Sequence, residues 1–313
     1  MKSKFLDLNR LEFFTTSICN SKCKHCSVIN KNSEEKHIDI DVAINLIKKL
    51  SSRYDLQSVM TFGGEPLLFP EVIYSIHKAA KNLGIPSRQI ITNGYWSKDD
   101  DKIQETVDRL EEVGVNKILI SVDAFHQEHI PIEIVKKVTK KLLKTSISDI
   151  KLSPCWVVSE EDDNFFNKKT KSILEEFKDL SIKVGSGNVV SPQGAALKNL
   201  NKYLPNKKLL EDGKCGDLPY TDTLDSIKSL SVEPNGDMII CKNFKIGNAE
   251  DENIEDTLEK YNPYNNIYMK TILEDGVQGL LKLADREGIE IEEREFYSIC
   301  DKCTYLKDKL ISK

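Results

Sequence analysis

One unit of the predicted fold reads LQSVMTFGGEPLLFPEVIYSIHKAAKNL, residues 56–83. A short β-like run at 56–62 leads into an amphipathic helix expected from about 70 to 83. Gly63-Gly64-Glu65-Pro66 lies between them, at the carboxyl end of the strand. Because no hairpin turn joins strand to helix, the unit predicts a parallel strand followed by a crossover helix.

The same alternation runs through the first two thirds of the chain. Strands are predicted at 11–16, 56–62, 89–92, 117–122, 150–158 and 182–190, and helices at 41–50, 70–83, 99–113, 132–143 and 163–177. This pattern indicates an α/β fold with a parallel sheet, open or closed into a barrel.

The alternation of strands and helices ends at about Ser191, where loops rich in Pro, Gly and Asn begin. A hairpin is predicted from 229–233 and 237–241, because Pro234-Asn235-Gly236 between them is a turn signal. A helix at about 270–286 and a Lys-rich tail follow. We therefore expect two domains, at 1–190 and 191–313.

Composition narrows the class of protein. The 313 residues carry a formal charge of -5, so the chain lacks the basic excess that attracts nucleic acid. No run approaches the ~18 apolar residues of a membrane helix, and charged residues interrupt the first 14 positions where a signal peptide needs an apolar core. We expect a cytoplasmic protein that binds neither nucleic acid nor membrane.

Eight cysteines in such a chain are expected to be metal ligands or reactive thiols, because a reducing cytosol does not keep disulfides. Their distribution separates the two possibilities. Three lie close together, two more form a pair, and the others are spread between, in the order Cys19, Cys23, Cys26, Cys155, Cys215, Cys241, Cys300 and Cys303. The clustering favours metal.

Polar residues follow four successive predicted strands. They are the first three cysteines, then Gly63-Gly64-Glu65-Pro66, then Thr92-Asn93-Gly94, then Ser121, Asp123 and His126. The carboxyl ends of parallel strands share one edge of the sheet, where catalytic groups collect. The four loops are therefore expected to form one site. The nearby His126, Glu128 and His129 either orient a substrate or are solvated.

The spacing CxxxCxxC permits either zinc or an iron-sulfur cluster. Structural zinc needs a fourth ligand, and His25 is awkwardly placed for that role because it is adjacent to Cys26. A 4Fe–4S cluster held by three thiolates instead leaves one iron open to bind a further molecule.

The CxxxCxxC motif followed by GGEP resembles the radical S-adenosylmethionine (SAM) superfamily. The resemblance covers about 11–190 and implies a partial (β/α)6 barrel with a 4Fe–4S cluster on Cys19, Cys23 and Cys26. It also implies that SAM, reduced through a partner such as flavodoxin or ferredoxin, yields a 5'-deoxyadenosyl radical that abstracts hydrogen from a substrate. The residues implied to hold SAM are Gly63, Gly64 and Glu65 for its amino group, His25 against the adenine, and Asn93, Ser121 and Asp123 for the ribose or carboxylate.

The later cysteines resemble a twitch domain, the shortened form of the SPASM domain. The pattern is Cys215, then Gly236-x4-Cys241, then Cys300-x2-Cys303. The resemblance implies a second, auxiliary 4Fe–4S cluster on these four cysteines. The same spacing also permits a structural zinc knot.

Cys155 remains. Alternation along 151–157 places Ser153 and Cys155 on one face of the strand and Leu152 and Trp156 on the other. If the polar face looks into the barrel, the Cys155 thiol is a hydrogen-atom donor to a substrate radical. The other interpretation is a buried cysteine that packs as a small hydrophobe.

Motifs at 91–96, 121–126, 194–196 and 298–303 are similar to radical peptidyl epimerases. That similarity implies a ribosomally made precursor peptide as substrate, changed by epimerisation or cross-linking. In that group a second cysteine follows the auxiliary ligand and donates hydrogen, whereas Lys242 follows Cys241 here. Two alternatives stay open: a twitch-type small-molecule alcohol dehydrogenase whose auxiliary cluster accepts electrons, and a non-catalytic iron-sulfur or zinc protein.

Overall fold

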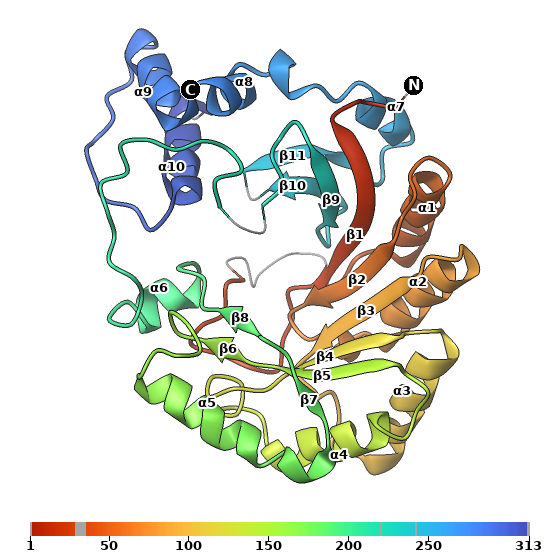
Figure 1. Ribbon diagram of the computed structural model, residues 1–313. Helices are drawn as coiled ribbons and strands as arrows, with labels where there is room; N and C mark the ends of the chain where they lie inside the picture. Colours follow the sequence, from red (N-terminus) through yellow and green to blue (C-terminus); the bar gives the residue numbers. More distant parts are fainter. Residues whose placement is uncertain (1, 29–35, 219–220, 242, 312–313) are drawn as a thin grey trace.

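A computed structural model describes residues 2–28, 36–218, 221–241 and 243–311 (Figure 1). Its main sheet has nine strands in the order β11-β10-β9-β1-β2-β3-β4-β5-β7, and β6 pairs with β8 separately. The strands are β1 (Leu6–Thr16), β2 (Ser58–Gly63), β3 (Ser87–Thr92), β4 (Lys117–Ser121), β5 (Asp149–Ser153), β6 (Cys155–Trp156), β7 (Lys183–Val184), β8 (Asn188–Val189), β9 (Ile227–Val232), β10 (Asp237–Cys241) and β11 (Phe244–Asn248).

The strands β1-β2-β3-β4-β5-β7 pair in parallel, each with its neighbour. Five crossover helices cover the outer side of this sheet (Figure 1). They are α1 (Ile40–Ser51), α2 (Pro70–Asn82), α3 (Asp100–Glu112), α4 (Ile132–Leu142) and α5 (Phe165–Glu175), with short 3-10 turns η1 (Pro66–Leu68) and η2 (Lys178–Leu180). The predicted α/β class and partial parallel barrel are confirmed.

The helices begin and pack as their sequences dictate. Asp39 caps α1 by accepting a hydrogen bond from the Val42 amide, and Asp99 caps α3 in the same way. The apolar face of α1 buries Leu46 and Ile47 in one core with β1 and β2. A second core fills the space between α3, α4 and the middle strands. The barrel wall is therefore fixed by its outer helices.

Two strands that the sequence predicts as continuous are each divided. The run 150–158 becomes β5 and β6, because Pro154 has no amide hydrogen to continue the ladder. The run 182–190 becomes β7 and β8 where Gly187 takes a φ of +73° and passes close to the Pro154 carbonyl. The later halves, β6 and β8, turn away from the main sheet and pair with each other.

The predicted helix at 270–286 is also divided, into α8 (Ile267–Glu274) and α9 (Gly276–Arg286). Gly276 has a φ of +66° and its neighbour Val277 donates to Gly213 O at 2.9 Å. A Cβ at position 276 would lie 2.4 Å from that carbonyl oxygen. The helix therefore breaks at Gly276 because the chain there packs closely against the backbone of Gly213, a contact between distant segments that the local apolar pattern does not encode.

The predicted hairpin forms β9 and β10, and it extends the main sheet. β9 runs parallel to β1, with Phe13 opposite Val232, while β10 runs antiparallel to β9. Leu230 and Met238 share a core with β1 and α1. Residues on both sides of the predicted boundary at 190 thus contribute to one sheet, and the division into two domains stays a prediction.

The remaining helices are α6 (Ala195–Asn199), α7 (Ile254–Glu259), η3 (Pro263–Asn265) and α10 (Ile299–Ile311). Helix α10 occupies much of the segment expected to be a Lys-rich tail. Its Leu306 is buried with Tyr268 and Leu280 in a third core, which α8, α9 and α10 share (Figure 1). Among the described residues, no helix is long and apolar enough to cross a membrane.

Candidate functional site

A cavity of about 410 Å³ opens at the carboxyl ends of the barrel strands. Residues from every strand-end loop predicted to form the site line it. The predicted site residues on its wall are Cys19, Cys23, His25, Cys26, Gly63, Gly64, Asn93, Ser121, Asp123 and Cys155. The structure thus brings together segments that are more than 130 positions apart in the sequence.

The two glycines after β2 hold the cysteine loop against the sheet. Gly64 donates its amide proton to Thr16 O at 2.6 Å, and Glu65 donates to Ile18 O at 2.9 Å. A Cβ on Gly64 would lie 2.1 Å from Ile18 O, and one on Gly63 would lie 2.5 Å from Thr16 O. Side chains at either position would therefore displace the loop that carries the three cysteines.

Glu65 lies behind the cavity wall and is 0 % exposed. Its carboxylate accepts hydrogen bonds from Leu67 N at 3.0 Å, Thr92 Oγ1 at 2.8 Å and Asn93 N at 2.7 Å. Burial raises the pKa of Glu65, and these three donors oppose the rise. In the structure the residue joins the β2 loop to the end of β3, and its predicted contact with a cofactor amino group stays a prediction.

Asn93 connects the end of β3 to the cysteine loop. Its side-chain amide donates to Asn20 Oδ1 at 2.9 Å and points at Cys19 Sγ at 3.9 Å. Its side-chain oxygen accepts from Tyr95 N at 2.8 Å. Asn93 therefore lies next to the cysteines, while its predicted contact with ribose stays a prediction.

Asp123 is fully buried below the cavity and organises the loop after β4. Oδ1 accepts the amides of Phe125 and His126 at 2.9 and 3.0 Å, and Oδ2 accepts His126 Nδ1 at 2.8 Å and Cys155 N at 3.2 Å. Burial disfavours the Asp123 anion, but the attraction of His126 and its hydrogen bonds outweigh burial and lower the pKa of Asp123. Burial likewise disfavours the charged form of His126, yet Asp123 raises the pKa of His126.

The sequence alone leaves the role of His126 open. It lies three residues after Asp123, a spacing that lets a carboxylate at the start of a helical turn reach a histidine ring. The Asp-x-x-His spacing is therefore the signal that could have identified it. Ser21, which lies 2.9 Å from Cys23 Sγ through its hydroxyl, was also not predicted.

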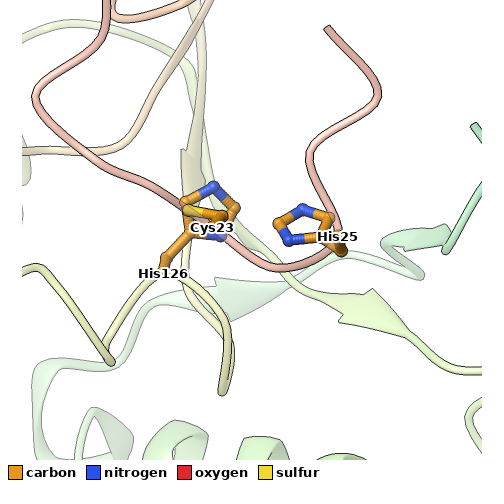
Figure 2. Close-up of side chains that lie close together, drawn as sticks. All are labelled: Cys23, His25 and His126. Carbon is orange, nitrogen blue, oxygen red and sulfur yellow. The ribbon is translucent and has the colours of Figure 1, made fainter. Parts of the chain in front are cut away.

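Cys23, His25 and His126 approach one another across the cavity. Figure 2 shows Cys23 and His25 on one loop and His126 entering from the loop after β4. One potential ligand atom from each lies within 4.8 Å of the other two. The His25 ring packs on Phe125 at 4.7 Å, its Nδ1 is buried without a hydrogen-bond partner, and burial together with His126 lowers the pKa of His25 to about 4.

The three loop cysteines suit a 4Fe–4S cluster. All three line the same cavity, and burial raises the pKa of Cys23 to about 12, with Cys19 and Cys26 among the smaller contributors. Three thiols on one cavity can bind different irons of one cluster. The rest of this cavity, with His25, Gly63 and Ser121 on its wall, would leave room beside such a cluster for a further molecule.

Cys155 faces the same cavity. It is 8 % exposed, and Ser153 and Pro154 line the cavity beside it. Burial raises the pKa of Cys155 well above its usual range, with Asp123 and Cys23 adding to the rise. The position of Cys155 on the cavity wall is thus observed, and its role as a hydrogen donor stays a prediction.

The other four predicted ligands gather far from this cavity along the sheet. Cys215, Cys241 and Cys303 belong to the third core, and Cys300 lies one turn before Cys303 on α10. Burial raises the pKa of Cys303 to about 11, and Cys241, Cys300 and Cys215 each contribute. The four thiols are thus within electrostatic reach of one another. Lys242, singled out by the sequence argument, lies outside the described residues.

Two polar side chains contact the sulfur of Cys303. Asn243 Nδ2 donates to Cys303 Sγ at 3.6 Å, and the Tyr268 hydroxyl lies 3.4 Å from the same sulfur. The backbone N–H of Asn243 also donates a hydrogen bond to Cys241 Sγ, at 3.4 Å. Hydrogen bonds to sulfur of this kind surround thiolates that hold metal centres. The auxiliary cluster itself stays a prediction.

A parallel partial barrel that carries three cysteines on a cavity at its mouth is an α/β arrangement that suits a metal held by thiolates. Residues 13–151 match the family model of the radical SAM superfamily. This part of the chain is a radical SAM domain, a kind of domain that binds SAM and a 4Fe–4S cluster, and the chain is a radical SAM enzyme.

Relatives extend beyond that domain. YydG of Bacillus subtilis, a protein named for peptide biosynthesis, is 24% identical over 302 residues, which is 92% of this chain and 88% of YydG. The GTP 3',8-cyclase of Chlorobaculum tepidum is 27% identical over 145 residues, so the match spans 44% of this chain and less than half of the cyclase, 42%.

Among solved structures, SuiB of Streptococcus suis bound to its precursor peptide SuiA superposes with a TM-score of 0.53. The two are 13% identical, and the match covers 83% of this chain and 66% of SuiB. This likeness shows a shared fold.

Proposed function

We propose that this radical SAM enzyme modifies a ribosomally made peptide, by epimerising a residue or by forming a cross-link. The full-length similarity to YydG supports a peptide substrate. SuiB, which shares the fold, was crystallised with a precursor peptide. The observation that carries the proposal is that Cys155 lines the same cavity as the three loop cysteines.

Epimerisation needs a hydrogen atom removed from a substrate carbon and another returned from the opposite side. When bound, the cluster and SAM supply the radical that removes the first hydrogen. The Cys155 thiol supplies the second from its intact S–H bond, which burial preserves. The sulfur radical left on Cys155 then takes one electron and one proton, and we assign the electron to a flavodoxin or ferredoxin partner.

Cross-linking differs in the fate of the substrate radical, which must lose an electron. The four cysteines of the third core support an auxiliary cluster as the acceptor, because a cluster with four thiolates has no open iron and is suited to electron transfer. The same group keeps a second function open, a twitch-type dehydrogenase that oxidises a small-molecule alcohol.

The deciding experiment uses protein purified and reconstituted with iron and sulfide without oxygen. It is given SAM, a reductant, and any short peptide whose reading frame lies beside its gene. We expect methionine and 5'-deoxyadenosine to form, and a peptide product of altered mass in heavy water. Turnover of small alcohols with no change in any peptide would favour the dehydrogenase. Absence of SAM cleavage with every peptide and alcohol supplied would contradict the proposed function.

A further inference from the structure

The tightest group of potential metal donors in the described part of the chain is a mixed set. It joins one thiol and two imidazoles, from Cys23, His25 and His126, with all three donor atoms within 4.8 Å (Figure 2). Cys19 and Cys26 line the same cavity but stand outside this group. The site thus contains two overlapping ligand sets that share Cys23.

The surroundings of the mixed set suit a single ion. Asp123 Oδ2 accepts the hydrogen bond of His126 Nδ1 at 2.8 Å, which leaves Nε2 of that ring for a metal. A carboxylate on the far nitrogen is the usual support of a zinc-bound histidine. His25 brings a second imidazole, whose Nδ1 is buried without a hydrogen-bond partner.

Distances are compatible with zinc after small side-chain rotations. Ligands about 2.0–2.3 Å from a tetrahedral zinc stand roughly 3.5 Å apart, somewhat closer than the 4.8 Å limit that contains these three atoms. One thiolate and two imidazoles form a ligand set that zinc prefers, and a water molecule can complete the tetrahedron.

We infer that, before its iron-sulfur cluster is inserted, the barrel binds one zinc ion through Cys23, His25 and His126, and that this ion excludes the cluster. Zinc displaces the Cys23 thiol proton to solvent, and both imidazoles bind in their neutral form, so no electron is exchanged. The exclusion follows because Cys23 cannot hold the zinc and an iron of the cluster together. The inference goes beyond the proposed function and does not depend on the substrate.

The test uses full-length, cluster-free protein in which Cys300→Ala and Cys303→Ala remove the second group of thiols as a competing site. Zinc affinity is measured by competition with a chromophoric chelator, and cobalt absorption reports thiolate ligation. We expect one zinc per chain. His126→Ala should lower the affinity by more than about 100-fold, and Asp123→Asn by about 10–100-fold. His129→Ala, an exposed histidine in the same loop, should change nothing.

A second pair of variants separates the two ligand sets. Cys19→Ala with Cys26→Ala removes two cluster ligands and should leave zinc binding intact. If that double variant loses zinc while His126→Ala keeps it, the ion sits on the three cysteines and the inference is overturned. Absence of zinc binding overturns it equally. Circular dichroism of each variant shows whether the fold is retained.

Competition with the cluster is measured on the same preparations. Zinc added before reconstitution should reduce iron uptake in the parent protein, and the His126→Ala variant should resist this effect. Equal zinc sensitivity of both proteins would refute the exclusion. Reconstitution without zinc, run in parallel, reports independently whether the proposed cluster forms at all.

Discussion

The backbones of Gly64 and Ile18 cross so closely that a Cβ on Gly64 would lie 2.1 Å from Ile18 O. Gly64→Ala should therefore displace the cysteine loop, lower the free energy of unfolding by about 3 kcal/mol or more, and reduce iron incorporation. Gly185→Ala is the matched control, since its nearest contact would be an ordinary 3.5 Å. Urea unfolding and iron analysis check both. Wild-type iron content in Gly64→Ala would show that the cysteine loop accommodates the added Cβ and still binds iron.

Glu65→Ala should destabilise the protein and weaken SAM binding. The substitution leaves three buried donors, on Leu67, Thr92 and Asn93, without their acceptor. We expect a loss on the order of a few kcal/mol, measured by thermal unfolding, with weaker SAM binding in equilibrium dialysis. Thr92→Val removes one donor alone and should have the smaller effect. SAM affinity unchanged in Glu65→Ala would remove the residue from the binding site.

Reconstituted protein should contain about eight iron and eight sulfide per chain, as two 4Fe–4S clusters require. Replacing Cys19, Cys23 and Cys26 together by Ala should leave about half, and so should replacing the four C-terminal cysteines. Elemental analysis and electron paramagnetic resonance check this. Stoichiometric zinc without sulfide, in protein prepared without oxygen, would contradict both clusters.

Stability should fall in mild acid because of His77. This residue is fully buried, its Nε2 lies 2.9 Å from Thr61 Oγ1, and burial lowers the pKa of His77 to about 3. The unfolded chain takes up a proton below about pH 6.5 that the folded chain refuses, so stability is complete above that pH and declines toward pH 3 at up to about 1.4 kcal/mol per pH unit.

His77→Leu should remove that contribution. Between pH 6 and pH 4 its free energy of unfolding should decline by roughly 2 kcal/mol less than that of the wild type. Urea titrations at both pH values measure the difference, and His129→Ala should behave as the wild type. An equal decline in all three proteins would assign the acid sensitivity to other groups.

The fate of the substrate radical should identify the reaction. If Cys155 donates hydrogen, the peptide takes up one solvent deuterium, and Cys155→Ser stalls the product while 5'-deoxyadenosine still forms. If the auxiliary group accepts an electron, the product is two hydrogens lighter, and the variant with Cys300 and Cys303 replaced loses it. Mass spectrometry distinguishes these outcomes. A lighter product with fully active Cys155→Ser would end the epimerase hypothesis.

Local sequence predicted what depends on local periodicity. The six parallel strands and five crossover helices follow from alternating and helical apolar patterns, and residues at the predicted strand ends supplied eight of the predicted site residues that line the cavity. The start of β1 at Leu6 was missed although Leu6 and Leu8 are buried, because charged neighbours interrupt the run.

What the sequence could not predict depends on contacts between distant segments. Gly276 breaks a helical pattern because it meets Gly213, and β9 joins β1 across more than 200 positions. Lysines interrupt the apolar pattern of α10, so the sequence does not predict this helix. Its apolar side chains pack against α8 and α9 in the third core.

The pairing of β9 with β1 sets the offset along the sheet between the end of β1, which leads into the first cysteines, and Cys241 at the end of β10. The first set follows Thr16 at the end of β1, whereas β10 runs back from the hairpin, so the register places Cys241 near the level of Arg10. Six residues of strand separate those levels, about 20 Å. While the ladder between β1 and β9 is intact, the end of β1 and the end of β10 keep this offset along the sheet, so an electron passing from one group of thiols to the other would travel along the sheet and not only across it.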